Sequence, residues 1–209
     1  HDMRTPLTRL RLGLEMSGTD STLMEYMTQD IEVMDAMLGQ FLDYSRGVHH
    51  EEILPGDPTT IIERISHRYG ERVVFSPPHL THTYALRLKS FERAITNLVD
   101  NGLKYGSPPI EICLKEISDA AFSGLCMTVR DHGPGIPDSE FERIKQPFMR
   151  LESSRTGIPG TGLGLAIVER IIHSHHGKLA LYNHPEGGLC AEIHIPATPS
   201  PPHPHMTSV

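Results

Sequence analysis

The chain has 209 residues, which is long enough for one large or two small domains with cores of their own. Its 19 basic and 26 acidic side chains give a formal charge of −7, and this argues against a nucleic-acid-binding protein, which normally presents a basic surface. No apolar run approaches the roughly 20 residues of a membrane-spanning helix, and no signal peptide is recognisable, so we expect a soluble chain. Because it begins with His rather than Met, we expect a fragment.

Apolar residues recur at intervals of three and four in two segments at the start of the chain. The first stripe consists of Met3, Leu7, Leu10 and Leu14, and the second of Met24, Met27, Ile31, Met34, Leu38 and Phe41. Such spacing is the a/d seam of paired helices. Since a lone helical hairpin leaves its stripe exposed, we expect residues 1–46 to form a dimeric four-helix bundle with a second copy. Packing of the seam on the rest of the same chain is the alternative.

Residues 47–56 are polar, carry Pro55 and are expected to form a linker. Residues 57–196 mix helical and strand patterns, which favours an α+β sandwich with helices on one face of a mixed sheet. We expect helices at 58–70, 90–105 and 165–175, and strands at 72–75, 83–88, 110–116, 125–130, 178–182 and 190–195. The Pro- and His-rich tail, 197–209, is predicted to be disordered.

Cysteine and histidine spacing gives no metal-binding motif. Cys113, Cys126 and Cys190 lie far apart without a CxxC pair, so we expect buried, reduced thiols in a cytosolic protein. The chain also has 14 histidines, clustered at 49–50, 173–176 and 203–205. No cysteine or carboxylate completes a coordination shell at ligand spacing, so we expect solvated surface histidines, and a proton-sensing role stays open.

Two glycine-rich runs indicate a phosphate site. One, at 131–135, follows an expected strand, and the other, at 160–165, opens an expected helix. Glycines at a helix start let backbone N–H groups approach phosphate oxygens, which the helix dipole also favours. One such run is weak support, since ordinary turns use glycine too. The polar segment 136–159 between the two runs is longer than an ordinary connection between elements, and this favours a lid over the site.

The expected helix 90–105 has a polar side. Asn97, Asn101 and Lys104 lie on it, opposite the apolar residues that pack on the sheet. Asparagine is a poor helix former, so two of them one turn apart favour a nucleotide and metal site over a merely solvated face.

The first residues form a third cluster. The imidazole of His1 is a competent nucleophile near neutral pH, and the carboxylate of Asp2 is able to accept a ring proton. Pro6 removes a helical hydrogen bond and is expected to bend the helix just beyond His1. Taken alone, His1 is equally well a tag remnant.

Together these motifs resemble those of sensor histidine kinases of two-component systems. The H, N, first G, F and second G boxes of that family resemble, in chain order, His1–Pro6, Asn97–Tyr105, Asp131–Gly135, Pro147–Arg150 and Gly160–Leu165. The H box and the stretch 154–156 are most similar to the EnvZ-like osmosensor branch. The resemblance implies a histidine-phosphotransfer hairpin followed by a Bergerat-type ATP-binding domain, as found in the GHKL ATPases.

The resemblance also implies an ATP site. Its members would be Asn97, Asn101, Lys104, Tyr105, Asp131, Gly133, Gly135, Phe148, Gly160, Thr161, Gly162, Leu163 and Gly164. Asn101 would hold Mg²⁺, and Asp131 would accept a hydrogen bond from the adenine amino group. Two positions depart from the family pattern: Gly102 replaces the usual alanine, and Lys145 replaces the first aromatic of the F box.

The implied reaction is phosphorylation of His1 by ATP, followed by transfer to an aspartate in the receiver domain of a response regulator of the EnvZ/OmpR kind. Asp2 would act as general base, Arg4 would assist with charge, and Thr5 would serve the reverse, phosphatase reaction. The protein would be a homodimer and the cytoplasmic portion of a bacterial inner-membrane protein, anchored only through upstream segments. A gyrase- or HSP90-like ATPase, a phosphatase-dominant enzyme and a non-catalytic dimeric module are the alternatives.

Overall fold

The computed structural model describes residues 51–78, 80, 83–118, 122–151 and 161–197, together with separate positions between 25 and 42. Those separate positions are all helical and fall in the segment where the second apolar stripe predicts a helix. The first stripe, the turn that follows it and the tail 198–209 lie outside the described residues.

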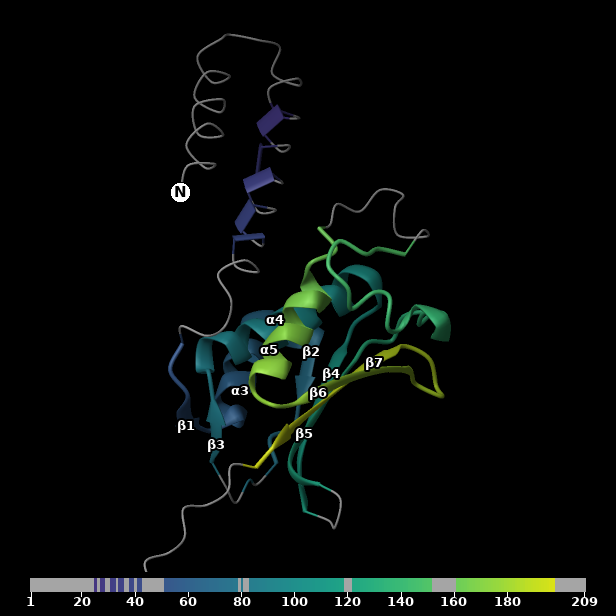
Figure 1. Cartoon of the computed structure of the whole chain (residues 1–209). Coiled ribbons are helices and arrows are strands. Elements are labelled where there is room, and N and C mark those ends of the chain that lie inside the picture. Colours follow the sequence, from purple (N-terminus) through teal and green to yellow (C-terminus); the bar gives the residue numbers. More distant parts are fainter. Residues whose placement is uncertain are drawn as a thin grey trace, which may run out of the picture.

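Five strands form one mixed sheet in the order β2-β4-β5-β7-β6 (Figure 1). They are β2 (Val73–Phe75), β4 (Ile110–Ser118), β5 (Ser123–Arg130), β6 (Lys178–Asn183) and β7 (Leu189–Pro196). β2 runs parallel to β4, and the other neighbours are antiparallel. The mixed sheet predicted from the sequence is therefore confirmed.

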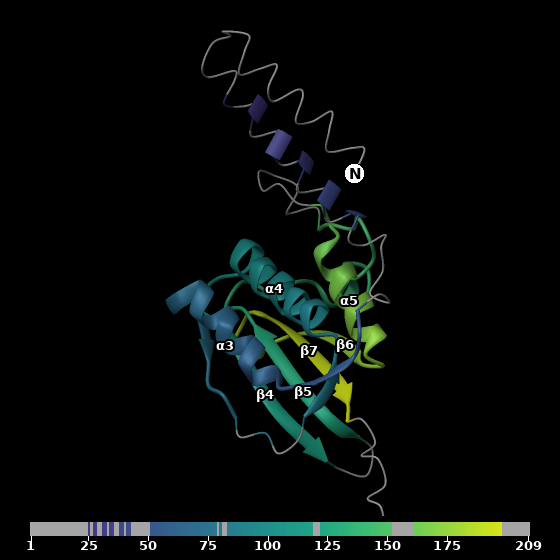
Figure 2. The same ribbon diagram turned by 90° about the vertical axis from the view of Figure 1, so that its left-hand side faces the viewer.

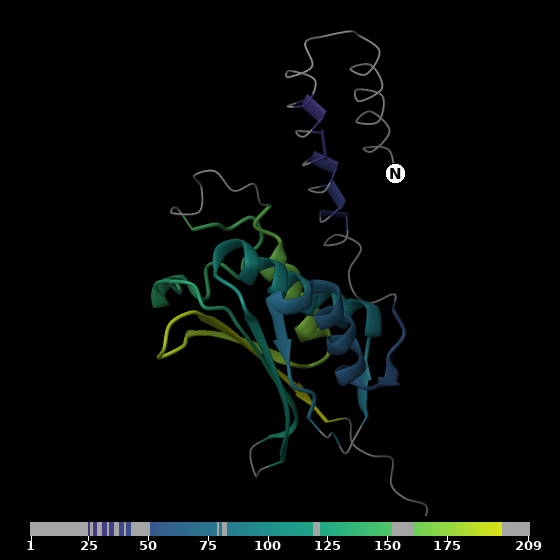
Figure 3. The same cartoon turned by 180° about the vertical axis from the view of Figure 1, so that it is seen from behind.

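Three helices lie on the same face of this sheet: α3 (Pro58–Tyr69), α4 (Leu88–Tyr105) and α5 (Gly164–Ser174) (Figure 2). Because side chains alternate along a strand, Leu125, Met127 and Val129 of β5 enter the core on that face. Cys126, Thr128 and Arg130 point to the opposite face, which no described element covers (Figure 3). Two short 3₁₀ turns, η1 (Gly70–Arg72) and η2 (Asp138–Glu140), complete the elements of the sandwich.

A second, two-stranded sheet pairs β1 (Leu54–Gly56) with β3 (Tyr84–Leu86) in antiparallel register. Just before β1, the carboxylate of Glu51 accepts hydrogen bonds from the backbone N–H groups of Lys89 at 2.7 Å and Ser90 at 2.9 Å. It also accepts one from the Ser90 hydroxyl at 2.6 Å. Residues 51–56, in the segment expected as the linker, are thus bonded to the sandwich.

The predicted helices and strands are found within a few residues of their expected bounds, with two local differences. Leu88 was expected to end a strand but begins α4, and β1 was not predicted at all. The early start of α4 has a physical reason. The residue before α4, Arg87, supplies no side-chain cap, and the cap comes instead from Glu51, whose position in the sequence gives no local sign of it.

The cysteines and histidines differ in part from expectation. All three cysteines are free thiols, and Cys126 and Cys190 are buried, but Cys113 is exposed. His175 is only 5% exposed, so the expectation that it is solvated is wrong. Its ring lies beside Phe91 and hydrogen-bonds on both sides, as most buried polar groups do.

Candidate nucleotide-binding site

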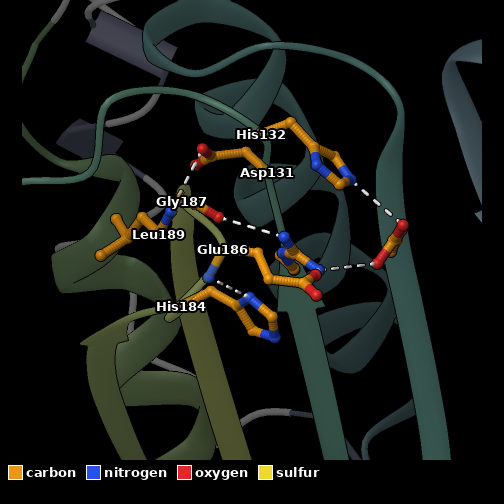
Figure 4. Close-up of polar contacts among 8 residues, drawn as sticks. Asp131, His132, His184, Glu186, Gly187 and Leu189 are labelled. Atoms are coloured by element: carbon orange, nitrogen blue, oxygen red, sulfur yellow. Dashed lines mark hydrogen bonds and ion pairs between the residues drawn. The ribbon is translucent and has the colours of Figure 1, made fainter.

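Asp131 follows the last residue of β5 and is buried. Its Oδ1 accepts a hydrogen bond from the backbone N–H of Leu189 at 3.2 Å (Figure 4). It accepts a second one from the backbone N–H of Gly133 at 2.8 Å. Its own N–H donates to the Leu189 carbonyl at 3.1 Å. No described residue donates to Oδ2. The carboxylate is therefore fixed in position and keeps one acceptor oxygen for a further donor.

Glycines make room for this carboxylate. A Cβ added to Gly106, the residue after α4, would lie 2.5 Å from Asp131 Oδ1, closer than real Cβ atoms approach. One added to Gly133 would lie 2.5 Å from the Cα of Gly106, and one added to Gly188 would overlap the Asp131 carbonyl. The C-terminal end of α4 and the β6–β7 turn thus pack directly on Asp131.

A polar network holds the β6–β7 turn against the end of β5 (Figure 4). Arg130 donates to the carbonyl of Gly187 at 3.2 Å and lies 3.6 Å from the carboxylates of both Glu111 and Glu186. His132 Nε2 lies 3.1 Å from the other oxygen of Glu111. The network thereby ties β4, the end of β5 and the β6–β7 turn together around Asp131.

The segment after Gly135 is held by Asn183, the last residue of β6. Asn183 accepts from the N–H of Ile136 at 3.0 Å and donates to its carbonyl at 2.8 Å and to Asp138 at 3.1 Å. Gly135 has φ +69°, and a Cβ there would collide with the Asn183 amide, so the turn requires glycine.

Asn97 and Asn101 lie on the side of α4 that faces the start of α5. A Cβ on Gly164 would lie 3.2 Å from Asn101 Nδ2 and 3.3 Å from its Oδ1, so the Asn101 amide lies against the first residue of α5. The Nδ2 atom of Asn97 is buried without a hydrogen-bond partner. A buried donor without a partner lowers the stability of the fold, and a hydrogen bond to a ligand oxygen would remove this penalty.

The start of α5 adds further donors. Its N-cap residue, Leu163, makes no side-chain cap, and its N–H is the donor to Thr161 Oγ1 at 3.2 Å. The first N–H groups of an uncapped helix carry positive partial charge and attract anions. Asn97, Asn101 and the first residues of α5 thus bring together groups of the kind that bind an anion such as a phosphate.

The donor set also fits Mg²⁺ beside phosphates. Mg²⁺ is commonly held by one or two protein oxygens, with phosphate oxygens and waters as its other ligands. Asn101 Oδ1 offers one such oxygen. One turn further along α4, the Lys104 ammonium lies 5.3 Å from the centre of the Tyr105 ring, which is 40% exposed. Both side chains therefore lie at the edge of the site.

One residue of the expected lid, Phe148, is bonded to the second glycine-rich run. The N–H of Phe148 donates to the Gly162 carbonyl at 2.9 Å, and Gly162, with φ +69°, lies against the backbone of Phe148 and Met149. The Phe148 ring is 60% exposed. Lys145, where an aromatic residue was expected, has a side chain only 10% exposed and pairs with Glu142 at 2.6 Å.

Five of the predicted site residues lie outside the described residues, so the structure does not place them: His1, Asp2, Arg4, Thr5 and Gly160. The others form one region around the ends of α4, β5 and α5. Several residues of this region were missed from the sequence: Gly106, Asn183, Gly188 and Leu189. Among these residues, only Gly106 could have been suspected from the sequence, since it directly follows the N box.

This region combines an acceptor carboxylate at the end of a central strand, amides on one helix and an uncapped, glycine-rich start of the next helix. These groups are suited to a nucleotide and point to an ATPase domain. Residues 87–199, more than half of the chain, match the histidine kinase-, DNA gyrase B-, and HSP90-like ATPase family. The chain belongs to this family.

Its relatives include sensor histidine kinases. It is 32% identical over 198 residues to the sensor histidine kinase GtrS of Pseudomonas aeruginosa, covering 94% of this chain and 40% of GtrS. The chain thus spans less than half the length of that curated relative. Among the residues that the structure describes, no helix has the length and hydropathy needed to cross a membrane.

Two solved structures support the same assignment. The mycobacterial sensor histidine kinase MprB is 26% identical, with a TM-score of 0.55 over 70% of this chain and 99% of that one. The histidine kinase domain of the Escherichia coli osmosensor EnvZ is 29% identical, with a TM-score of 0.52 over 75% of this chain and 98% of that one. The α+β fold of the ATPase domain is therefore that of histidine kinases.

Proposed function

We propose that this chain is the catalytic core of a sensor histidine kinase that uses ATP and Mg²⁺ to phosphorylate His1 and then passes the phosphoryl group to an aspartate of a response regulator. The observation that carries the nucleotide part is the buried, unpartnered Nδ2 of Asn97 beside Asn101 and the uncapped start of α5. The kinase relatives and the motif from His1 to Pro6 support the rest.

ATP would lie with its adenine at Asp131, where Oδ2 accepts from the exocyclic amino group. Gly133 and Gly135 would let the base approach the backbone, and the Lys104 and Tyr105 side chains would flank the nucleotide. The phosphates would extend to Asn97 and the start of α5, where Thr161, Gly162, Leu163 and Gly164 would close over them together with Gly160 and Phe148. Mg²⁺ held by Asn101 would neutralise phosphate charge.

In the chemical step, a ring nitrogen of His1 forms a bond to the γ-phosphorus while the bond between that phosphorus and the leaving oxygen of ADP breaks. The transition state is loose, so the protein chiefly aligns the groups and spreads charge. Asp2 would take the imidazole proton and fix its tautomer, and Arg4 would lie near the transferred group. The phosphoramidate formed is reactive enough to give its phosphoryl group to an aspartate carboxylate.

Transfer also requires His1 to reach the γ-phosphate. Because Glu51 and β1 are bonded to the sandwich, a hinge between the hairpin and the ATPase domain would lie before residue 51 rather than along all of 47–56. We further propose a homodimer, since Met27, Met34 and Phe41 are 39%, 53% and 40% exposed in the single chain. The likeness to sensor kinases supports a place on the cytoplasmic side of a bacterial inner membrane.

The deciding experiment incubates the chain with γ-labelled ATP and Mg²⁺. We expect an acid-labile, alkali-stable label on the protein. His1→Gln should abolish labelling and leave ATP binding intact. Undiminished acid-labile label on His1→Gln would contradict the proposal, and hydrolysis of ATP without any protein-bound label would indicate the gyrase- or HSP90-like alternative.

A second variant measures the balance between kinase and phosphatase activity. Thr5→Ala should retain labelling of His1 but lose the ability to hydrolyse the phospho-aspartate of the partner. Thr5 is four residues after His1, which is one turn further in the expected helix, and it would orient the attacking water. Label retention on a purified response regulator, with and without Thr5→Ala, separates a kinase from a phosphatase-dominant enzyme.

A further inference from the structure

The uncovered face of the sheet carries a cluster of three metal-ligating side chains that the nucleotide site does not use. Cys126 of β5 lies directly opposite His194 of β7, and Glu192 lies two residues before His194 and so on the same face. Cys126 Sγ is 3.8 Å from His194 Nε2, which is 2.7 Å from Glu192 Oε1. All three ligand atoms lie within 4.8 Å of one another.

The sheet fixes this cluster on rigid elements. Both strands lie in the interior of the sheet, and their register places the thiol and the imidazole side by side without any loop. The ring of Phe122 packs edge-on against His194, with centroids 5.2 Å apart. Cys126 is 2% exposed, while the side chains of Glu192 and His194 each keep 30% of their surface exposed. The cluster is therefore sheltered on one side and open to water on the other.

The spacing suits a tetrahedral ion. Zn–S bonds of about 2.3 Å and Zn–N and Zn–O bonds of about 2.0–2.1 Å place sulfur about 3.6 Å from nitrogen, and nitrogen about 3.3 Å from oxygen. The observed Cys126–His194 separation needs almost no change, and the Glu192 carboxylate needs to withdraw from the imidazole by about half an ångström. A rotation of one flexible side chain is enough.

The charges around the cluster also suit a divalent ion. A thiolate and a carboxylate together match a double positive charge. On the neighbouring strands, Lys115 lies opposite Cys126 and Lys178 opposite His194, and both lysines are exposed, so water screens their positive charges.

We propose that Cys126, Glu192 and His194 form a binding site for Zn²⁺ or a similar divalent transition metal, with water as the fourth ligand on the open side. The site is separate from the nucleotide site, because Asp131 lies five residues, or about 16 Å, further along the strand direction. Metal bound here would clamp β5 to β7, the two strands whose ends position Asp131 and Leu189.

The test uses Co²⁺ as the probe, with the full chain. Thiolate-to-cobalt charge transfer gives an absorption band only when sulfur binds the metal, so the chain's other histidines do not contribute. We expect this band at one equivalent of Co²⁺, and we expect added Zn²⁺ to abolish it. It should be absent in Cys126→Ser and at least tenfold harder to saturate in His194→Gln, since His194 supplies the nitrogen ligand.

Matched controls are the other two thiols of the same face, Cys113→Ser and Cys190→Ser, which should keep the band. Cys190 pairs with Arg130, four residues along the strand from Cys126, and is too far to join the cluster. Absence of the band in the parent protein at saturating Co²⁺ would overturn the proposal, and so would its persistence in Cys126→Ser with loss in Cys190→Ser.

A second readout guards against a variant that fails to fold. Zn²⁺ should raise the thermal midpoint of the parent chain, because a ligand that binds only the folded state stabilises it. The same rise should occur in Asp131→Asn, which alters the nucleotide site alone, and should be lost in His194→Gln and Glu192→Gln. An equal rise in all of these proteins would show that the metal binds elsewhere.

Discussion

At the scale of single residues, the site depends on positions that carry no side chain. Asp131 is held by two backbone donors and surrounded by glycines, so its free oxygen points in one direction. In the proposed site, this preorganisation would lower the free-energy cost of binding a nucleotide, since the acceptor would not need to be ordered when the ligand arrives.

Gly106→Ala should disturb that arrangement. The new Cβ would lie 2.5 Å from Asp131 Oδ1, and the carboxylate would have to move. We expect ATP affinity to fall tenfold or more in a binding titration. Gly102→Ala is the matched control, since its Cβ would meet chiefly the end of the flexible Ile110 side chain at 2.7 Å, and alanine is favoured over glycine in a helix. Equal affinities for the two variants would show that Asp131 is not the adenine acceptor.

Asn97→Ala should separate stability from binding. In the unliganded protein, Asn97 Nδ2 is a buried donor without a partner, so removing it should not destabilise the fold and should raise the free energy of unfolding by about 0.5–2 kcal/mol. ATP binding should weaken at least tenfold. Denaturant unfolding without nucleotide and a binding titration measure the two effects, and a destabilised variant that binds ATP normally would contradict this role.

At the scale of elements, α4 depends on a remote cap. Its own N-cap residue contributes no side-chain hydrogen bond, and Glu51 supplies the acceptors instead. Although burial alone would raise the pKa of Glu51, hydrogen bonds from Ser90 and Lys89 lower it below its usual value. The cap therefore remains ionised at neutral pH.

Glu51→Ala should cost about 1–2 kcal/mol of unfolding free energy, because it leaves the first N–H groups of α4 unpaired. The neighbouring exposed residue provides the control: Glu52→Ala should change stability by no more than about 0.5 kcal/mol. Chemical denaturation of both variants measures the difference. If the two behave alike, the carboxylate of Glu51 does not cap the helix in solution.

His175 joins α5 to the start of α4. Its Nε2 accepts from the N–H of Arg87 at 2.9 Å, and its Nδ1 lies 2.8 Å from the Ile171 carbonyl, which fits a neutral imidazole with its proton on Nδ1. Burial lowers the pKa of His175, while the Ile171 carbonyl and Glu51 act in the opposite direction and Arg87 and His176 add to the lowering.

This lowered pKa predicts a pH dependence. The unfolded chain binds a proton near pH 6.5 that the folded chain resists, so the stabilisation is complete above about pH 6.5 and is lost as the pH falls below it. His175→Gln keeps an acceptor but does not titrate. We therefore expect its thermal midpoint to fall less than that of the parent between about pH 7.5 and 5.5. Parallel curves would exclude His175 as the cause.

At the scale of the whole molecule, the ATPase domain buries its own core, but the helical segment before it exposes Met27, Met34 and Phe41. A regular apolar seam of this kind is covered by pairing with another helix of matching period. A second copy of the chain meets that requirement without any additional partner.

Ile31→Asp combined with Leu38→Asp should convert the proposed dimer to monomers, since pairing would bury unpaired charge. Sedimentation measures the outcome. Glu25→Lys changes a charge on an exposed residue of the same helix off the seam and should remain dimeric. A clean dimer in the double variant would refute the four-helix bundle.

How much the sequence could predict follows from the range of each interaction. Asn97, Asn101 and Lys104 could be placed on one side of α4, because helical periodicity is local. The mixed sheet and its strands could be predicted from alternating patterns in the same way. The role of Glu51 as the cap of α4 could not be predicted, because Glu51 lies 38 and 39 residues from the two backbone donors in the sequence.

The sequence by itself determined the class of protein: the two glycine-rich runs, the Asn pair and the histidine motif occur in the order of a histidine kinase. Only the tertiary structure decided which groups meet. The register of β5 with β7 places Leu189 on Asp131 across 58 residues and His194 beside Cys126 across 68. From spacing alone no metal cluster could be seen, because strand pairing rather than sequence distance sets which side chains become neighbours.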